Sequence, residues 1–133
     1  MGRTLQVLVA DDDPGVLLLL RALEELEDVE VTTANDGLDA LEKARAGRFD
    51  VFVFDIMMPG LDGVELAREV RADADLKPVP IIFVTARSDD ETKAAARSAG
   101  GDLFLTKPIS MNDLSRAITD LAAGRKKRRR RRT

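Results

Sequence analysis

The chain has 133 residues, a formal net charge of −3, a hydrophobic fraction of 44% and a charged fraction of 34%. These values are typical of one soluble globular domain, long enough to bury a core without covalent cross-links. Cysteine and histidine are both absent, which excludes disulfides, thiolate or imidazole metal sites, and catalysis by cysteine or by a serine–histidine pair. The apolar N-terminal stretch is too short for a signal peptide and the longest apolar run, residues 16–20, is too short to span a bilayer, so we expect a cytoplasmic protein.

The charge is divided between an acidic body and a basic C-terminal segment. Residues 125–133 read RKKRRRRRT and hold eight of the 21 basic residues, which leaves 13 basic and 24 acidic residues, a net charge of −11, in residues 1–124. Like charges repel in such a run, and no apolar side chain offsets the entropy of ordering it. We therefore predict a domain over residues 1–124 and a tail over residues 125–133 that is disordered or begins a linker.

Two readings of the tail are open. Its clustered cations suit nucleic acid or an anionic membrane surface through nonspecific electrostatics. It has no aromatic residue for base stacking, which weakens a role in binding single strands. The alternative is a solubilising terminus, or a linker, without any ligand of its own.

The first part of the body predicts a strand, a helix and a second strand. Residues 6–10 (QVLVA) form a short apolar run typical of a strand buried on both faces. The run of Asp11, Asp12 and Asp13 followed by Pro14 marks the start of a helix that we expect to reach about Leu26. The expected apolar stripe of this helix is Val16, Leu19, Leu20 and Leu23. Residues 29–34 (VEVTTA) alternate in polarity and predict a less buried strand.

The middle of the body continues the alternation. Residues 35–37 (NDG) predict a turn before a second helix that Gly47 ends. The expected apolar positions of that helix are Leu38, Leu41 and Ala44. Residues 51–54 (VFVF) predict a third, fully buried strand ending on Asp55. The following MMPGLDG, residues 57–63, predicts a turn because proline and glycine interrupt regular structure.

The last part of the body completes five strand–helix units. A third helix has Leu66, Ala67 and Val70 as its apolar residues, and IIFV (residues 81–84) predicts another buried strand. An acidic start then opens an alanine-rich fourth helix, and LFL (residues 103–105) predicts the last strand. The final helix has Leu114, Ala117, Ile118 and Leu121 as its apolar stripe. Strict alternation with short connections predicts a doubly wound α/β fold, a parallel sheet with helices on both faces.

Polar residues follow the apolar runs, and ligands of such folds bind beyond the carboxyl ends of the strands. These residues are Asp11, Asp12 and Asp13 after the first strand, then Asp55, Thr85 and Lys107 after the third, fourth and fifth. Converging carboxylates repel each other unless a cation neutralises them. Carboxylate oxygens without histidine or cysteine suit Mg²⁺, which commonly binds phosphate as well. We therefore expect phosphoryl chemistry in which one carboxylate is the nucleophile while Mg²⁺ and Lys107 neutralise the transferring group.

Each of these residues also has an ordinary structural explanation. Residues 11–13 can serve only as a helix N-cap cluster, and Asp55 can be an acid at a loop edge. Lys107 and Thr85, taken singly, are compatible with plain structural or surface positions. Phe104 is most simply a core or half-buried strand residue. The combination at four strand ends is what favours a functional site.

Four segments together resemble a known family. They are VLVADDDP (residues 7–14), VFVFDIMMPGLDGVEL (residues 51–66), IIFVTA (residues 81–86) and FLTKP (residues 104–108). Over essentially all of residues 5–123 the chain resembles a response-regulator receiver domain of two-component signalling, similar to the chemotaxis regulators. The resemblance implies a flavodoxin-like fold with five parallel strands in the order 2-1-3-4-5, an order that alternation alone does not provide.

The resemblance also implies roles at the acidic positions. Asp55 would be the phosphoacceptor, receiving a phosphoryl group from a sensor histidine kinase, a phosphotransfer protein or a small donor such as acetyl phosphate. Asp12 would be the main Mg²⁺ ligand, Asp11 would orient a metal-bound water, and the backbone carbonyl of Met57 would complete the protein ligands.

The remaining implied roles concern the switch. Thr85 would hydrogen-bond one phosphoryl oxygen and Lys107 would pair with another. Phe104 would be the aromatic residue that turns inward when Thr85 moves, and Pro108 would follow a cis peptide bond. Phosphorylation would then change the face made by the fourth helix, the fifth strand and the fifth helix, where a downstream protein target binds.

Other functions are open at this point. A receiver-like scaffold would bind partners without phosphorylation, although the complete set of site residues argues against it. The chain can also be the receiver part of a DNA-binding regulator. A phosphatase or mutase with an aspartyl nucleophile would place a second aspartate where Met57 stands, so we expect no enzyme beyond self-phosphorylation and self-dephosphorylation.

Overall fold

A computed structural model describes residues 4–26, 28–87 and 89–131 of the chain. Its centre is a five-stranded sheet in the order β2-β1-β3-β4-β5, and every neighbouring pair of strands is parallel. The strands are β1 (Leu5–Ala10), β2 (Val29–Ala34), β3 (Val51–Asp55), β4 (Ile81–Thr85) and β5 (Leu103–Thr106). The predicted fold class and strand order are therefore confirmed.

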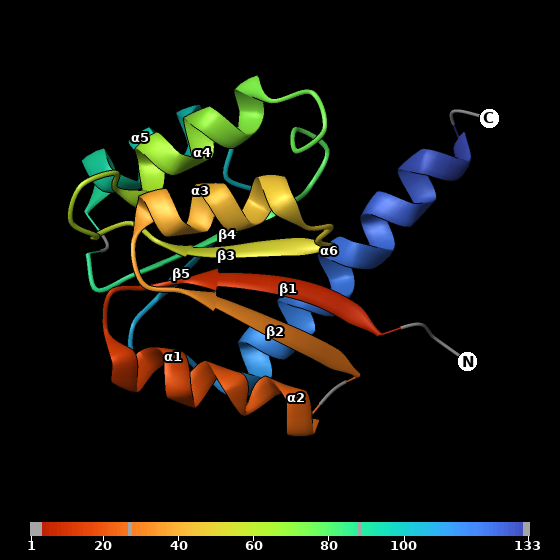
Figure 1. Cartoon of the computed structure of the whole chain (residues 1–133), viewed down its shortest axis with the longest axis horizontal. Helices are drawn as coiled ribbons and strands as arrows, with labels where there is room; N and C mark the ends of the chain where they lie inside the picture. Colours follow the sequence, from red (N-terminus) through yellow and green to blue (C-terminus); the bar gives the residue numbers. More distant parts are fainter. Residues whose placement is uncertain (1–3, 27, 88, 132–133) are drawn as a thin grey trace.

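Helices cover both faces of the sheet (Figure 1). One face packs against α3 (Gly37–Ala46), α4 (Gly63–Ala72) and α5 (Asp90–Ser98). The other face packs against α1 (Pro14–Arg21), α2 (Leu23–Leu26) and α6 (Met111–Arg131). Among the described residues, none of these helices is long and apolar enough to cross a membrane.

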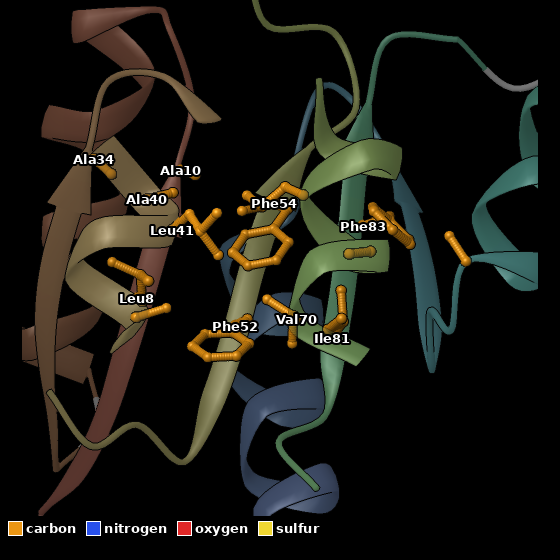
Figure 2. Close-up of a cluster of buried hydrophobic side chains, with 14 of the residues drawn as sticks. Leu8, Ala10, Ala34, Ala40, Leu41, Phe52, Phe54, Val70, Ile81 and Phe83 are labelled. Carbon is orange, nitrogen blue, oxygen red and sulfur yellow. The ribbon is translucent and has the colours of Figure 1, made fainter. Parts of the chain in front are cut away.

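The core follows the alternation of side chains along the central strands. Phe52, Phe54 and Phe83 point to one face, where they pack with residues of α3, α4 and α5 (Figure 2). The rings of Phe52 and Phe54 stack with their centroids 5.2 Å apart. Val51 and Val53 lie in the cluster on the opposite face with residues of α1, α2 and α6. Every residue of β3 and β4 is buried, as expected for central strands covered on both sides.

Two details of the helices differ from the sequence prediction. The first helix is divided at Ala22, which caps α1 before α2 begins at Leu23. Leu19 is 51% exposed and Leu38 is 66% exposed, although both were expected on apolar faces. In α3 the buried positions include Ala40 and Leu41. Leu38 lies about 200° around the helix from Ala40, so it faces away from the core.

The C-terminal segment also differs from the prediction. The composition favours an irregular tail from residue 125, whereas α6 continues to Arg131 without a break at that point. Arginine and lysine are good helix formers, and cations near a helix C-terminus interact favourably with the helix dipole. The last two tail residues, Arg132 and Thr133, lie outside the described residues.

At the edge of the sheet where the strands begin, Arg71 joins three segments. It lies near the end of α4, and its guanidinium group donates to the carbonyl oxygens of Gly100 (2.6 Å from Nη2), Lys77 (2.8 Å) and Val79 (2.7 Å). Its Nη2 also lies 3.0 Å from a carboxylate oxygen of Asp102. One side chain therefore links α4 to the segments entering β4 and β5.

Candidate functional site

Main-chain hydrogen bonds fix the carboxyl ends of the strands. The amide of Asp11 donates to the carbonyl oxygen of Ala34 (3.1 Å), which extends the pairing of β1 and β2 by one residue. The amide of Lys107 likewise donates to the carbonyl oxygen of Thr85 (2.8 Å), just beyond the last pair of β4 and β5. The strand ladders therefore fix the backbone from which the polar side chains start.

Three of the predicted side chains meet directly at this edge. The Lys107 ammonium nitrogen lies 2.9 Å from Asp11 Oδ2 and 3.2 Å from Asp55 Oδ2. Asp11 and Asp55 are 2% and 4% exposed, so both carboxylates are removed from bulk water. Buried carboxylates require a charged or hydrogen-bonded partner, and Lys107 provides one to both.

Asp12 completes a group of carboxylates suited to a metal ion. One oxygen from each of Asp11, Asp12 and Asp55 lies within 4.8 Å of the others, and Asp12 is exposed. The donor set is all oxygen, which fits a hard divalent cation such as Mg²⁺. An exposed ligand beside two buried ones also leaves a route by which a hydrated ion can enter.

Burial and neighbouring charges shift the pKa values of Asp55 and Lys107. Burial of the carboxyl group and the negative charge of Asp11 raise the pKa of Asp55, and Lys107 only partly offsets them. Burial alone would lower the pKa of Lys107, but its hydrogen bonds to Asp11 and Asp55 and their charges outweigh that effect and raise it. Lys107 is therefore held in its charged form at the centre of the site.

Neighbouring backbone groups orient the carboxylates. Asp13 is the N-cap of α1 and accepts from the amide of Gly15 (2.9 Å), so one residue of the acidic run does act as a cap. The amide of Asp13 in turn donates to Asp11 Oδ1 (2.9 Å). The amide of Met57 donates to Asp55 Oδ1 (3.2 Å), while the Met57 residue is 52% exposed. Each of the two buried carboxylates thus has one oxygen held by a main-chain amide and the other by Lys107.

Thr85 and Phe104 lie on the strands that border this group. Thr85 is fully buried at the end of β4, and its hydroxyl oxygen accepts from the amide of Arg87 (3.2 Å). Phe104 is half-buried on β5, and the ammonium nitrogen of Lys93 lies 5.8 Å from its ring centroid. The Lys107–Pro108 peptide bond is cis, as the resemblance implied.

Gly63 contributes to the site in a way that the sequence did not reveal. It was expected in a turn, but it is the first residue of α4, and its amide donates to the carbonyl oxygen of Ile56 (3.0 Å). A Cβ atom at this position would lie 2.2 Å from the backbone oxygen of Asp55. Only glycine therefore allows α4 to begin directly against the end of β3. A glycine just after the N-cap Asp62 is the signal that could have indicated such a close approach.

Comparison with known proteins tests the resemblance that these residues carry. A family model, the response regulator receiver domain, matches residues 7–119. The chain belongs to this family. It is a receiver domain of the kind found in two-component response regulators. Receiver domains bind Mg²⁺ at an acidic pocket, and the cluster of Asp11, Asp12 and Asp55 could hold such an ion.

Two curated relatives differ in how much of their length the receiver domain spans. It is 33% identical over 119 residues to protein PilH of Pseudomonas aeruginosa, covering 90% of this chain and 98% of that protein. It is 38% identical over 117 residues to the response regulator MprA of Mycobacterium leprae, covering 88% of this chain. The match spans 50% of MprA, so the chain spans about half the length of that relative.

A solved structure provides a comparison with metal in place. The receiver domain of a sensor histidine kinase from Pseudomonas aeruginosa PAO1 is described with a magnesium ion coordinated in its active site cleft. It is 28% identical to this receiver domain, with a TM-score of 0.83 and coverage of 90% of this chain and 98% of that one.

Proposed function

We propose that this receiver domain accepts a phosphoryl group on Asp55 from a phosphohistidine of a sensor histidine kinase or a phosphotransfer protein, and that it then signals to a downstream protein target. The observation that carries the proposal is the position of Lys107, whose ammonium nitrogen contacts both Asp11 (2.9 Å) and Asp55 (3.2 Å). A cation between two buried carboxylates is suited to stabilise the additional negative charge of an incoming phosphoryl group.

In the proposed step, a carboxylate oxygen of Asp55 attacks the phosphorus atom of the donor. A new bond forms between that oxygen and phosphorus while the bond between phosphorus and the donor's imidazole nitrogen breaks, and the bonding electrons leave with the imidazole. The product is an acyl phosphate. Met57 stands two residues after Asp55 and has no acidic group, so we expect no turnover of external phosphoesters.

The acidic residues are suited to hold the metal that this step would require. We propose Asp11, Asp12 and Asp55 as the carboxylates that hold Mg²⁺, with the Met57 carbonyl as a further ligand. An Mg²⁺ ion held by these residues would neutralise charge on the phosphoryl oxygens. The oxygen atoms of the three carboxylates, within 4.8 Å of one another, support this assignment.

Thr85 is proposed as the second contact to the phosphoryl group. Its hydroxyl oxygen already accepts a hydrogen bond from the Arg87 amide. A hydroxyl group can accept and donate at the same time, so its hydrogen is available for a phosphoryl oxygen. Lys107 would pair with another oxygen of the same group.

We further propose that phosphorylation changes the surface formed by α5, β5 and α6, with Phe104 as the residue that moves. Within α5, Ala96 is the buried residue, and elements that bury little apolar surface open at low free-energy cost. A pocket of about 410 Å³ lies between α5 and β5, and Phe104 and Leu103 are among its lining residues. The ring therefore has open space beside it in which to change position.

The test is the intact mass of the protein after incubation with acetyl phosphate and Mg²⁺. We expect the wild type to gain one phosphoryl group, and we expect Asp55→Asn to gain none. Asp75→Asn changes an exposed aspartate away from the acidic cluster and is the matched control, which should be labelled like the wild type. Adding a chelator should prevent labelling of every variant.

The outcomes separate the proposal from its alternatives. Labelling of Asp55→Asn would show that a residue other than Asp55 accepts the phosphoryl group. A wild type that takes no phosphoryl group, under conditions that label a known receiver domain, would favour a scaffold that works without phosphorylation. Hydrolysis of small phosphoesters at enzyme-like rates would instead indicate a phosphatase.

A further inference from the structure

The basic segment, defined here as residues 125–131, is a continuation of a well-anchored helix. α6 packs against the sheet through Leu114, Ile118 and Ala122, which are 0%, 1% and 6% exposed. The helix continues to Arg131, and Figure 1 shows its last part extending away from the sheet, on the side of the molecule where the N-terminus lies. The basic segment therefore begins three residues after Ala122, which is buried against the sheet.

The number of positive charges per unit length of this segment is close to the number of negative charges per unit length of duplex DNA. All seven residues of the segment are arginine or lysine. At 1.5 Å per residue they occupy about 10 Å of helix axis, and successive positions rotate by about 100°, so positive residues surround the axis. Duplex DNA carries one negative charge per 1.7 Å, or about six phosphates over the same length. An α-helix also fits the major groove of B-form DNA.

Composition favours duplex DNA over other anionic partners. The segment has no aromatic residue, and binding to single strands depends on base stacking. It has no apolar residue either, which an interfacial membrane helix uses to insert between lipids. Five of its seven residues are arginine. The planar guanidinium group of arginine can make two hydrogen bonds to one phosphate. The A-form groove of duplex RNA is too narrow and deep to admit a helix in the same way.

We propose that the basic segment of α6 binds duplex DNA through its phosphate backbone, without preference for base sequence. The body, with its net charge of −11, is repelled by the same phosphates and stays away from the duplex. Binding therefore depends on the segment alone and is strongly weakened by salt.

The experiment measures the binding of the full chain to a labelled DNA duplex by fluorescence anisotropy. With about six phosphates neutralised, the logarithm of the association constant should fall with a slope of about −5 against the logarithm of salt concentration. This slope corresponds to about a thousand-fold loss between 50 and 200 mM salt. Changing residues 128–131 together from arginine to glutamine should reduce the slope to about −3 and weaken binding at least about 100-fold at 100 mM salt.

Two controls separate charge from folding. Changing the same four residues to lysine keeps the charge and should preserve affinity within about threefold. Arg116 is exposed on the anchored part of α6, and Arg116→Gln should change affinity less than the single change Arg129→Gln. The urea midpoint should be the same for all these variants, because the core residues named above lie at other positions.

Several results would overturn the proposal. They are no duplex binding at 50 mM salt, equal affinity for the glutamine variant, or binding that is at least as tight to single strands. Binding to phosphatidylserine vesicles without binding to DNA would assign the segment to a membrane surface. Light scattering would detect self-association of the chain. Self-association that is lost when the basic segment is changed to glutamine would indicate that the segment binds the acidic body of a second copy instead of DNA.

Discussion

Replacing Gly63 with alanine would test whether the end of β3 is held by direct contact with the start of α4. The new Cβ atom would lie 2.2 Å from the backbone oxygen of Asp55 and 2.8 Å from the Cα atom of Ile56. To reach even 3.0 Å from that oxygen, the two atoms must separate by a further 0.8 Å. Neither neighbour can yield easily, because both belong to backbone at the end of a central, fully buried strand.

The magnitude follows from two opposing effects. Forcing extra atoms into a packed region costs about 1–3 kcal/mol, and contact with backbone places Gly63 at the upper end of that range. Alanine gains up to about 1 kcal/mol over glycine in a helix. We therefore expect Gly63→Ala to lower the free energy of unfolding by about 2 kcal/mol, which is a decrease of about 1 M in the urea midpoint.

Gly15→Ala is the matched control for this experiment. Gly15 also lies in the first turn of a helix that follows a strand end, but the nearest atom to its added Cβ is Asp13 Oδ1 at 3.2 Å. That atom is the end of a side chain and can move, so we expect a change within about 0.5 kcal/mol. If Gly63→Ala matched the wild type as closely as Gly15→Ala, the close contact between α4 and β3 would not constrain the fold.

Two further substitutions test other contacts. Arg71→Met removes the hydrogen bonds to the carbonyl oxygens of Gly100, Lys77 and Val79 and should destabilise the domain by about 2–4 kcal/mol. Arg68→Met changes an exposed residue of the same helix and should have little effect in the same urea titration; equal losses would contradict the role of Arg71. Hydrogen bonds from the Thr92 amide and hydroxyl lower the pKa of Asp89, the N-cap of α5, below its ordinary value of 3.8. Its stabilising effect is therefore complete above that value and is lost as pH falls through the lower folded pKa. Asp89→Ala should be less stable than the wild type at pH 7, with a difference that shrinks below pH 4; a difference that grew in acid would contradict this sign.

The sequence predicted most of what depends on local pattern. The apolar runs at residues 51–54 and 81–84 are fully buried strands, and Asp11, Asp55 and Lys107 meet as expected from their positions at strand ends. These predictions succeeded because parallel strands with short crossovers bring all their carboxyl ends to one edge.

What the sequence did not predict depends on packing or on weak preferences. The exposure of Leu19 and Leu38 depends on which side of each helix meets the sheet. Spacing alone does not distinguish an apolar residue that faces the sheet from one that faces solvent. The closeness of Gly63 to Asp55 is a tertiary contact between segments whose separation no local rule fixes. The helical backbone of the basic segment reflects the helix propensity of arginine and lysine. The sequence prediction gave more weight to the repulsion between like charges than to this propensity.

The contact between Lys107 and Asp11 joins residues 96 positions apart in the chain. Asp11 follows β1, the second strand of the sheet, and Lys107 follows β5, the strand at its far edge. This contact therefore cannot form before β3, β4 and β5 have all been added to the sheet beside β1. A chain that has not yet added β5 to its sheet therefore lacks the ammonium group that lies between the two buried carboxylates.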